Sequence, residues 1–349
     1  MPKDNEKIPL HDLVPLTPSE VEAFSAEQMV RCEECLRANP PTRVNCLYCS
    51  ASLPVTEKSA NMQKPALRRL EQWEQGINII LVPTSGTSLS DERLGAAAEL
   101  LKLRPDELRR VISSGRSLPL ARAASRDEAE LVVRRLGELG IDTISVADEQ
   151  LRLDERQMVR IRSASIKGDG LTGYQLAGMP GVVLEFSRID LLVLGRILVR
   201  RIEVKERTTR RAENDIVNSS EFFSDEPILD IYGEPDPPSW RIEAGSFDFS
   251  VLGRRKGLIA GENLRTLVEV IRELSPRVQL DESYAATRHT LEPVWPSRQR
   301  TEAGGWHRER PGMYSTSGII ESSNEDQFTL YSRLQYFLRL NSPVPVNEE

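Results

Sequence analysis

The four cysteines are the residues whose type and spacing could most clearly do chemistry. All of them lie within one short stretch of the 349-residue chain, as two Cys-x2-Cys pairs with ten residues between the pairs: Cys32, Cys35, Cys46 and Cys49. Each pair can aim two thiolates at one point, and two pairs together complete the tetrahedral shell that zinc prefers. The spacing therefore predicts one Zn2+ held by these four residues.

The predicted zinc is structural. A catalytic zinc keeps an open position for water, and four thiolates leave none. A redox dithiol is the other alternative, but the paired spacing favours a metal. Because a unit this short has almost no core, zinc binding would supply most of its folding free energy, roughly 10 kcal/mol or more.

The spacing Cys-x2-Cys-x3-Asn-x6-Cys-x2-Cys, with Asn39 in the middle position, resembles short bacterial zinc ribbons and the Ran-binding-protein type zinc finger. The resemblance covers residues 30–54. Those fingers often bind single-stranded RNA or ubiquitin, but Val30 stands at the expected tryptophan, and Leu36 and Arg37 replace the expected Thr-Phe. The resemblance therefore implies the metal and not the ligand.

Charge and composition restrict the classes of function. The formal net charge of −7 and the pI near 5.4 disfavour binding to nucleic acid. No run of about 18 apolar residues predicts a membrane span, and the N-terminus has no apolar signal core, so we expect a cytoplasmic protein. The three histidines, His11, His289 and His307, form no recognisable catalytic pairing. Carboxylate catalysis stays open, but we expect no enzyme.

From residue 77 the pattern predicts a small α/β unit. The apolar run INIILVP predicts a strand, and LSDERLGAAAELLKL and PDELRRVISSG predict two helices, the second opened by Pro105 and closed by Gly115. SLPLARAA predicts a strand that Pro119 pushes to a sheet edge. A capping box at Ser125 and Glu128 starts a helix ending at Gly140, and the strand IDTISV follows.

This order predicts a compact βααβαβ sandwich with Leu131, Val132, Leu136 and Leu139 of the last helix facing the sheet. The segment SRDEAELVVRRLGELGIDTISV resembles the C-terminal domain of the bacterial ribosomal stalk protein, over residues 77–147. In that family the domain recruits translation factors through a lysine-rich face. Asp91, Glu92 and Glu99 are interleaved with basic residues on the first helix here, so the resemblance implies a fold for protein contacts, with a structural spacer as the alternative.

The second half is predicted to be rich in strands. Residues Gly168 to Gly173 match GxGxxG, but glycine and proline at 178–181 forbid the helix that a dinucleotide site needs, so we expect a glycine turn. Strands are predicted at 182–186, 189–194 and 197–205, turning at serine or glycine, and again in ILDIYGE, SWRIEAG and SFDFSVLG. An amphipathic helix follows Gly261, and a last helix spans about 325–340 after a possible cap at Asn324.

Two basic stretches are ambiguous. Arg200, Arg201 and Lys205 belong to a run that continues to Arg211 and could meet an anionic lipid head group or a phosphate backbone. The interleaved glutamates are more typical of a solvated edge strand. The tail segment 292–316 combines Trp295 and Trp306 with several arginines. It could stack on bases or anchor a partner, or be a loop held against its own domain.

Together these patterns predict a multidomain α+β chain: a small zinc ribbon, a compact βααβαβ sandwich and a strand-rich domain, with a pleckstrin-homology-like order, closed by a helix. The expected parts are an N-terminal segment with a short helix (1–28), the zinc ribbon (29–54), a partly helical linker (55–76), the stalk-like domain (77–149), the β-rich domain (150–276) and a C-terminal extension with an amphipathic helix (277–349). We expect a non-enzymatic interaction or adaptor protein with protein partners and no small-molecule site. The alternative is a ribosome- or RNA-associated factor.

Overall fold

The chain divides in a computed structural model into two compact units, Met1–Ala66 and Leu67–Glu349. The structure describes residues 24–54, 62–63, 65, 67–71, 73–84, 89–151, 158–176, 178–208, 214–233, 239–310 and 313–341. Most of the segment expected to hold an N-terminal helix lies outside these residues, as does half of the expected linker. The first unit contains one short antiparallel pair, β1 (Val30–Arg31) and β2 (Ala38–Asn39).

The larger unit begins with the predicted element order strand, helix, helix, strand, helix, strand. These elements are β3 (Ile77–Leu81), α2 (Asp91–Leu101), α3 (Pro105–Ser113), β4 (Pro119–Ala123), α4 (Arg126–Glu138) and β5 (Thr143–Ala147), followed by the short helix α5 (Asp148–Leu151). The three strands form an antiparallel sheet in the order β4-β3-β5. Pro119, which has no N–H to donate, therefore lies on an edge strand as predicted.

The predicted cap of α4 is present with one difference. Ser125 Oγ accepts a hydrogen bond from the backbone N–H of Glu128, as a capping box requires. The Glu128 carboxylate accepts a hydrogen bond from the N–H of Ala124, whereas in a capping box it would accept from the N–H of Ser125. Of the four residues expected to face the sheet, Leu139 is only partly buried, while the other three are buried.

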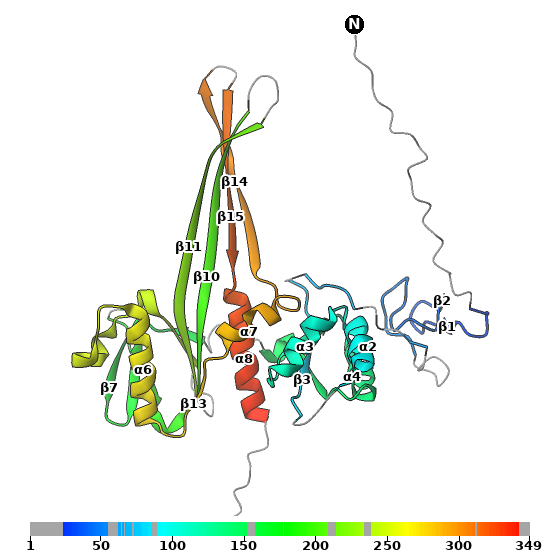
Figure 1. The fold of residues 1–349 in the computed structure, drawn as a ribbon, viewed down its shortest axis with the longest axis horizontal. Coiled ribbons are helices and arrows are strands. Elements are labelled where there is room, and N and C mark those ends of the chain that lie inside the picture. The colour runs from blue at the N-terminus through cyan, green and yellow to red at the C-terminus, as the bar shows by residue number, and fades with distance from the viewer. Residues whose placement is uncertain are drawn as a thin grey trace, which may run out of the picture. The chain divides into compact units, whose positions relative to one another are not determined.

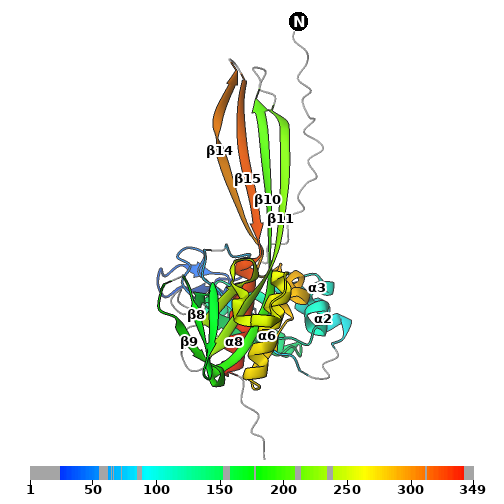
Figure 2. The ribbon, with the colours of Figure 1, turned by 90° about the vertical axis from the view of Figure 1, so that its left-hand side faces the viewer.

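A seven-stranded sheet organises the rest of the larger unit. Its order is β14-β15-β10-β11-β12-β6, and β13 pairs in parallel with β10. The strands are β6 (Met158–Arg160), β10 (Ile189–Thr208), β11 (Asn214–Gly233), β12 (Ser239–Glu243), β13 (Gln279–Asp281), β14 (Arg298–Arg310) and β15 (Met313–Ser323). The long strands β10, β11, β14 and β15 extend away from the other elements of this unit as an arm (Figure 1). Turned by 90°, the view shows β14, β15, β10 and β11 side by side along the arm (Figure 2).

The GxGxxG segment forms a turn between strands, as predicted. It joins β7 (Ser163–Lys167) to β8 (Gly170–Tyr174), and β9 (Val182–Glu185) completes a second three-stranded sheet. Gly168 has φ +58°, a conformation that glycine adopts without steric cost. No helix follows the motif among the described residues 169–176 and 178–185, so the motif lacks the helix that a dinucleotide site requires directly after it.

Three 3-10 turns replace part of the predicted strand pattern. They are η1 (Phe186–Arg188), η2 (Ala244–Ser246) and η3 (Phe249–Arg255). The expectation of a strand in SFDFSVLG was wrong, because the Asp248 side chain accepts from the N–H of Ser250 and starts a helical turn. The predicted helix beyond is α6 (Ala260–Leu274), whose buried side includes Leu264, Leu267 and Ile271.

The tail segment is also regular. Helix α7 (Tyr284–Leu291) precedes β14 and β15, so the segment for which a loop was one of the alternatives forms a strand pair, and helix α8 (Glu325–Asn341) ends the described chain. Asn324 fixes the start of α8 to β10, since its side chain accepts from Leu198 N and donates to Arg196 O. The part of the basic run up to Arg207 belongs to β10, which is paired on both sides, so the expectation of an edge strand was wrong there; Arg210 and Arg211 lie outside the described residues.

Two hydrophobic clusters lie on opposite sides of the large sheet. One includes Leu192, Trp240 and residues of α6. The other contains residues from all three of the parts expected at 77–149, 150–276 and 277–349, among them Leu136, Val193 and Tyr331. Their side chains share one core, so these segments are not packed independently of one another.

A polar chain joins the same segments. Trp295 Nε1 donates to Asn78 Oδ1 at 2.9 Å, and Asn78 Nδ2 donates to the buried carboxylate of Asp148 at 2.8 Å. The N–H of Gly76 and the guanidinium of Arg122 also donate to Asp148. Each of these hydrogen bonds satisfies a buried polar group. Together they hold the small antiparallel sheet in place against Trp295 of the tail segment.

Gly195 was expected to end a strand, and that expectation was wrong, because β10 runs through it without a turn. A Cβ atom placed on Gly195 would lie 2.3 Å from Cε2 of Phe328 on α8. The glycine therefore permits the close approach of a buried aromatic ring.

Gly195→Ala is expected to destabilise the larger unit by about 2–3 kcal/mol, because the added methyl group would force the fully buried Phe328 ring to shift. Urea unfolding of the full chain measures this. Gly318→Ala is the matched control, since its nearest neighbour, the Glu302 carbonyl oxygen, lies 4.0 Å away. Equal effects of the two substitutions would contradict the packing explanation.

No helix in the described part of the chain is both long enough and apolar enough to cross a membrane.

Candidate metal centre

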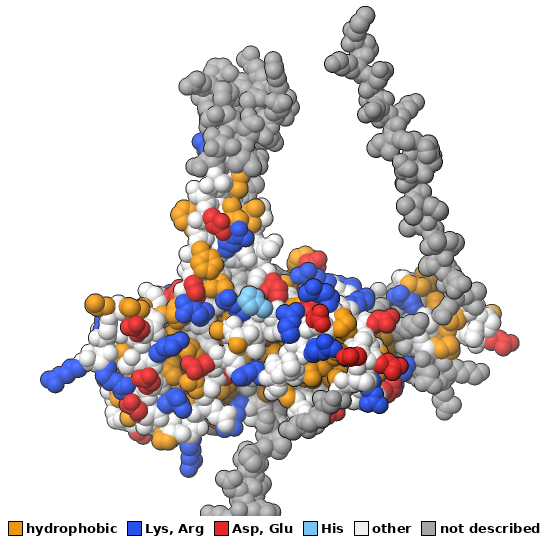
Figure 3. Space-filling model, in the orientation of Figure 1, with side chains coloured by type: hydrophobic (Ala, Val, Ile, Leu, Met, Phe, Trp, Pro, Cys, Tyr) orange, Lys and Arg blue, Asp and Glu red, His pale blue; other side chains and the backbone are white. Residues whose placement is uncertain are grey.

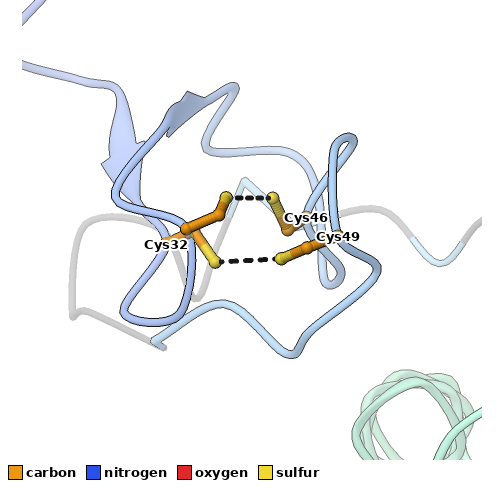
Figure 4. Close-up of side chains that lie close together, drawn as sticks. Cys32, Cys46 and Cys49 are labelled. Atoms are coloured by element: carbon orange, nitrogen blue, oxygen red, sulfur yellow. Dashed lines mark hydrogen bonds between the residues drawn. The ribbon is translucent and has the colours of Figure 1, made fainter.

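The structure brings all four cysteine sulfurs together. Every pair of Sγ atoms lies within 4.8 Å, and Cys32–Cys49 and Cys35–Cys46 are 3.5 Å apart (Figure 4). A disulfide would need about 2.05 Å. Four sulfurs bound to one zinc at about 2.3 Å would lie roughly 3.8 Å apart. The donor set and its spacing therefore fit a tetrahedral metal ion such as zinc, with four thiolates and no place for water.

The two Cys-x2-Cys turns have the same backbone geometry. In the first, Cys32 N donates to Arg37 O at 2.9 Å and Leu36 N donates to Cys32 O at 3.0 Å. The second turn repeats both bonds with Cys46, Ser50 and Ala51. The fourth residue after each leading cysteine has a positive φ, 59° at Leu36 and 60° at Ser50. This left-handed residue reverses the chain so that both sulfurs of a turn point to one side.

Asn39 links the two turns. Its side chain is fully buried, accepts from Leu47 N at 2.9 Å and donates to Arg37 O at 3.0 Å and to Cys46 Sγ at 3.4 Å. The asparagine that marked the resemblance therefore holds the second turn against the first. The surrounding core is small and comprises Val30, Cys32, Cys46 and Leu53, with Cys35 and Ala51 beside it.

In the metal-free site, hydrogen bonds decide which cysteine is a thiolate and which is a protonated thiol. Burial raises the pKa of Cys46, but hydrogen bonds from the N–H groups of Tyr48 and Cys49, from a neighbouring thiol and from Asn39 bring it down to about 6. The N–H of Ala51 lowers the pKa of Cys49, but burial and hydrogen bonds shared with the other thiols raise it to about 12. At neutral pH Cys46 is therefore mainly thiolate and Cys49 is protonated.

Zinc affinity is expected to fall on acidification. Between about pH 6 and pH 12 zinc must displace at least the proton of Cys49, so the affinity changes at least about tenfold per pH unit. Below about pH 6 Cys46 is protonated as well, and the slope steepens to at least about a hundredfold per unit. Competition with a chromophoric chelator from pH 7 to pH 5 measures this; an affinity that stays flat over that range would contradict it.

Three exposed apolar side chains lie around the cysteines, and none of them was predicted to be a site residue. Leu36, Leu47 and Tyr48 are each more than half exposed, and the Arg37 guanidinium lies 4.7 Å from the centre of the Tyr48 ring. The signal was present in the sequence. Leu47 and Tyr48 lie between the two ligands of a four-residue turn, where there is no interior to enter, so their side chains face outward; Leu36 directly follows the ligand Cys35.

Comparison of this chain with protein-family models, with curated proteins and with solved structures finds no match. The assignment of the cysteine site therefore depends on the spacing and geometry of its own residues.

Proposed function

We propose that this chain is a cytoplasmic interaction protein without catalytic activity, whose N-terminal unit is a ribbon held by one structural zinc. The observation that carries the proposal is the apolar trio Leu36, Leu47 and Tyr48 on the two metal-held turns. Turns fixed by a metal lose little conformational entropy when a partner binds, and exposed leucine and tyrosine are suited to anchor it. The ribbon thus serves as a docking surface for another protein.

The resemblances of the sequence belong to this proposal. The cysteine spacing and the role of Asn39 support a zinc ribbon of the Ran-binding-protein type. The order of elements from β3 to β5 supports the stalk-like domain, a fold used for protein contacts. The pleckstrin-homology-like layout of the β-rich part is the weakest of the three, because its strands also pair with the tail segment.

The absence of catalytic activity is proposed from the described side chains. His289 lies exposed on α7 beside Arg288. The buried carboxylates Asp148 and Asp230 are each held by an arginine and a further hydrogen bond. Groups held in this way stabilise the fold and are not free to exchange protons with a substrate.

A ribosome- or RNA-associated factor is the second candidate, and one observation favours it. Tyr48 presents an aromatic ring beside Arg37, a pairing that could stack on an unpaired base. Salt separates the two functions, because phosphate contacts weaken steeply with salt while apolar docking does not.

The test is a capture experiment with the full zinc-loaded chain at low and high salt, with bound protein and RNA identified. We expect Leu47→Ser/Tyr48→Ser to keep zinc and to lose a protein partner that persists in high salt. Glu33→Ser is the matched control, because Glu33 occupies in the first turn the place of Leu47 in the second. A partner retained by the double variant would contradict the proposal, and RNA lost with salt would favour the second candidate.

A further inference from the structure

The arm is a sheet one layer thick. We define it by the residues of β10 from Val199, of β11 up to Ser224, and by β14 and β15. From Val199 to Thr208, β10 pairs with β11 on one side and β15 on the other, and β14 pairs with the far edge of β15. Neither view shows a helix of the described chain against either face of the arm (Figures 1 and 2). A sheet of this size needs a covered hydrophobic face to be stable.

The two faces of the arm differ in chemistry. Alternation of side chains and the strand register place one set on the same face, which we name the apolar face: Ile202, Val204, Phe223 and Ile320. Phe223 is 66% exposed and Ile320 41%. The opposite face carries Phe222 and two neighbouring ion pairs, Arg201–Glu203 and Arg300–Glu302. Hydrophobic side chains reach the surface of the arm among charged ones (Figure 3).

The apolar face carries no net charge among its described side chains. Arg200 pairs with Glu221 at 2.5 Å on this face of the arm, and Arg196 pairs with Asp225 at 2.7 Å just below it, on the same side of the sheet. An anionic membrane or a nucleic acid would find no excess of positive charge here. Two identical faces of this kind can meet without repulsion, because each arginine keeps its own carboxylate.

The apolar face continues into a hollow at the base of the arm. A cavity of about 600 Å3 is lined on the same side of the sheet by Leu194 and Arg196 of β10, by Pro227 of β11 and by the start of α6. At its rim Leu258 is fully exposed and Ile259 is 58% exposed. The lining also includes the charged residues Asp225, Glu262, Arg265 and Glu282. Exposed apolar side chains therefore lie both at the rim of the hollow and on the arm, with ion pairs between them.

We propose that the apolar face is the interface with a second copy of this chain, related by a two-fold axis so that the two arms form a β-sandwich. Four strands about 4.8 Å apart over ten residues at about 3.3 Å give roughly 600 Å2 per face. The hollow and its rim bring this toward the roughly 800 Å2 per partner of a stable dimer. Aligned packing of two such faces about 10 Å apart buries Phe223 of each copy. The proposal does not depend on the zinc ribbon.

The test measures the mass of the zinc-loaded full chain by sedimentation over the micromolar range. We expect a dimer for the wild type and at least a hundredfold weaker dimer for Phe223→Asp. Phe222→Asp is the matched control, because both phenylalanines lie opposite an arginine of β10 and only the face differs. It should leave the dimer intact. Ile320→Asp on the apolar face should reproduce the loss, with far-UV circular dichroism reporting that each variant is folded.

The proposal is overturned if the wild type sediments as a monomer throughout this range. It is also overturned if Phe222→Asp dissociates the dimer as strongly as Phe223→Asp, because the interface would then not be specific to the apolar face. A monomeric chain whose apolar face binds a helix of another protein would also overturn the proposal, because the occupant of the face would not be a second copy.

Discussion

Removal of zinc is expected to unfold residues 24–54 and to leave the larger unit folded. Among the described residues, the buried apolar side chains of the ribbon are Val30, Val44, Leu53 and two of the cysteines, which is too little apolar area to offset the entropy of ordering the chain. Metal binding is expected to supply roughly 10 kcal/mol or more. The larger unit has two extensive clusters of its own.

Amide NMR spectra of the full chain measure this. Excess chelator, or Cys46→Ser, should collapse the dispersed signals of the ribbon and leave those of the larger unit in place. Added zinc should restore the signals after chelation but not in the variant, and native mass spectrometry should find one zinc per chain. Dispersed ribbon signals in the metal-free chain would contradict a metal-dependent fold.

Arg241→Met is expected to destabilise the larger unit by about 3–5 kcal/mol. Both partners of this ion pair are buried, and Arg241 Nε and Nη2 each donate to a carboxylate oxygen of Asp230 at 2.8 Å. Burial by itself lowers the pKa of Arg241, but Asp230 outweighs it and raises the pKa. Without the arginine, Asp230 is left buried with the Ser332 hydroxyl at 2.7 Å as its remaining side-chain donor.

Urea unfolding of the full chain measures the loss. Arg255→Met is the matched control, because the Arg255–Glu273 pair is exposed to solvent and should contribute little to stability. Asp230→Leu/Arg241→Met should recover part of the stability, since removing both charges leaves no buried charge unpaired. A single variant no less stable than its exposed control would show that water reaches Asp230.

Local patterns predicted the elements whose cause lies within a few residues. The Ser125 cap, the edge position of the strand that begins at Pro119 and the turn at Gly168 each follow from the conformation or hydrogen bonding of the residue itself. The same holds for the cysteines, because two short turns fix where their sulfurs point. The sequence therefore carried the candidate metal site and the order of elements from β3 to β5.

Gly195 and the tail segment were misjudged because the deciding contacts come from far along the chain. A glycine between two apolar runs has the same sequence pattern whether the chain turns there or a ring packs against it, and the ring belongs to Phe328. The sequence of β14 resembles that of a loop, but the segment forms a strand because it pairs with β15. Whether such a segment forms a strand depends on pairing partners far along the chain, and local propensity does not predict these partners.

The sequence by itself determined the cysteine cluster, the βααβαβ order and the main amphipathic helices. Only the tertiary structure decided that Trp295 reaches Asn78, that Arg241 meets Asp230, and that the long strands form a free arm with one apolar face. The physical reason is that backbone turns and caps are fixed by neighbouring residues. Burial, ion pairing and strand register depend on residues that meet only when the chain has folded.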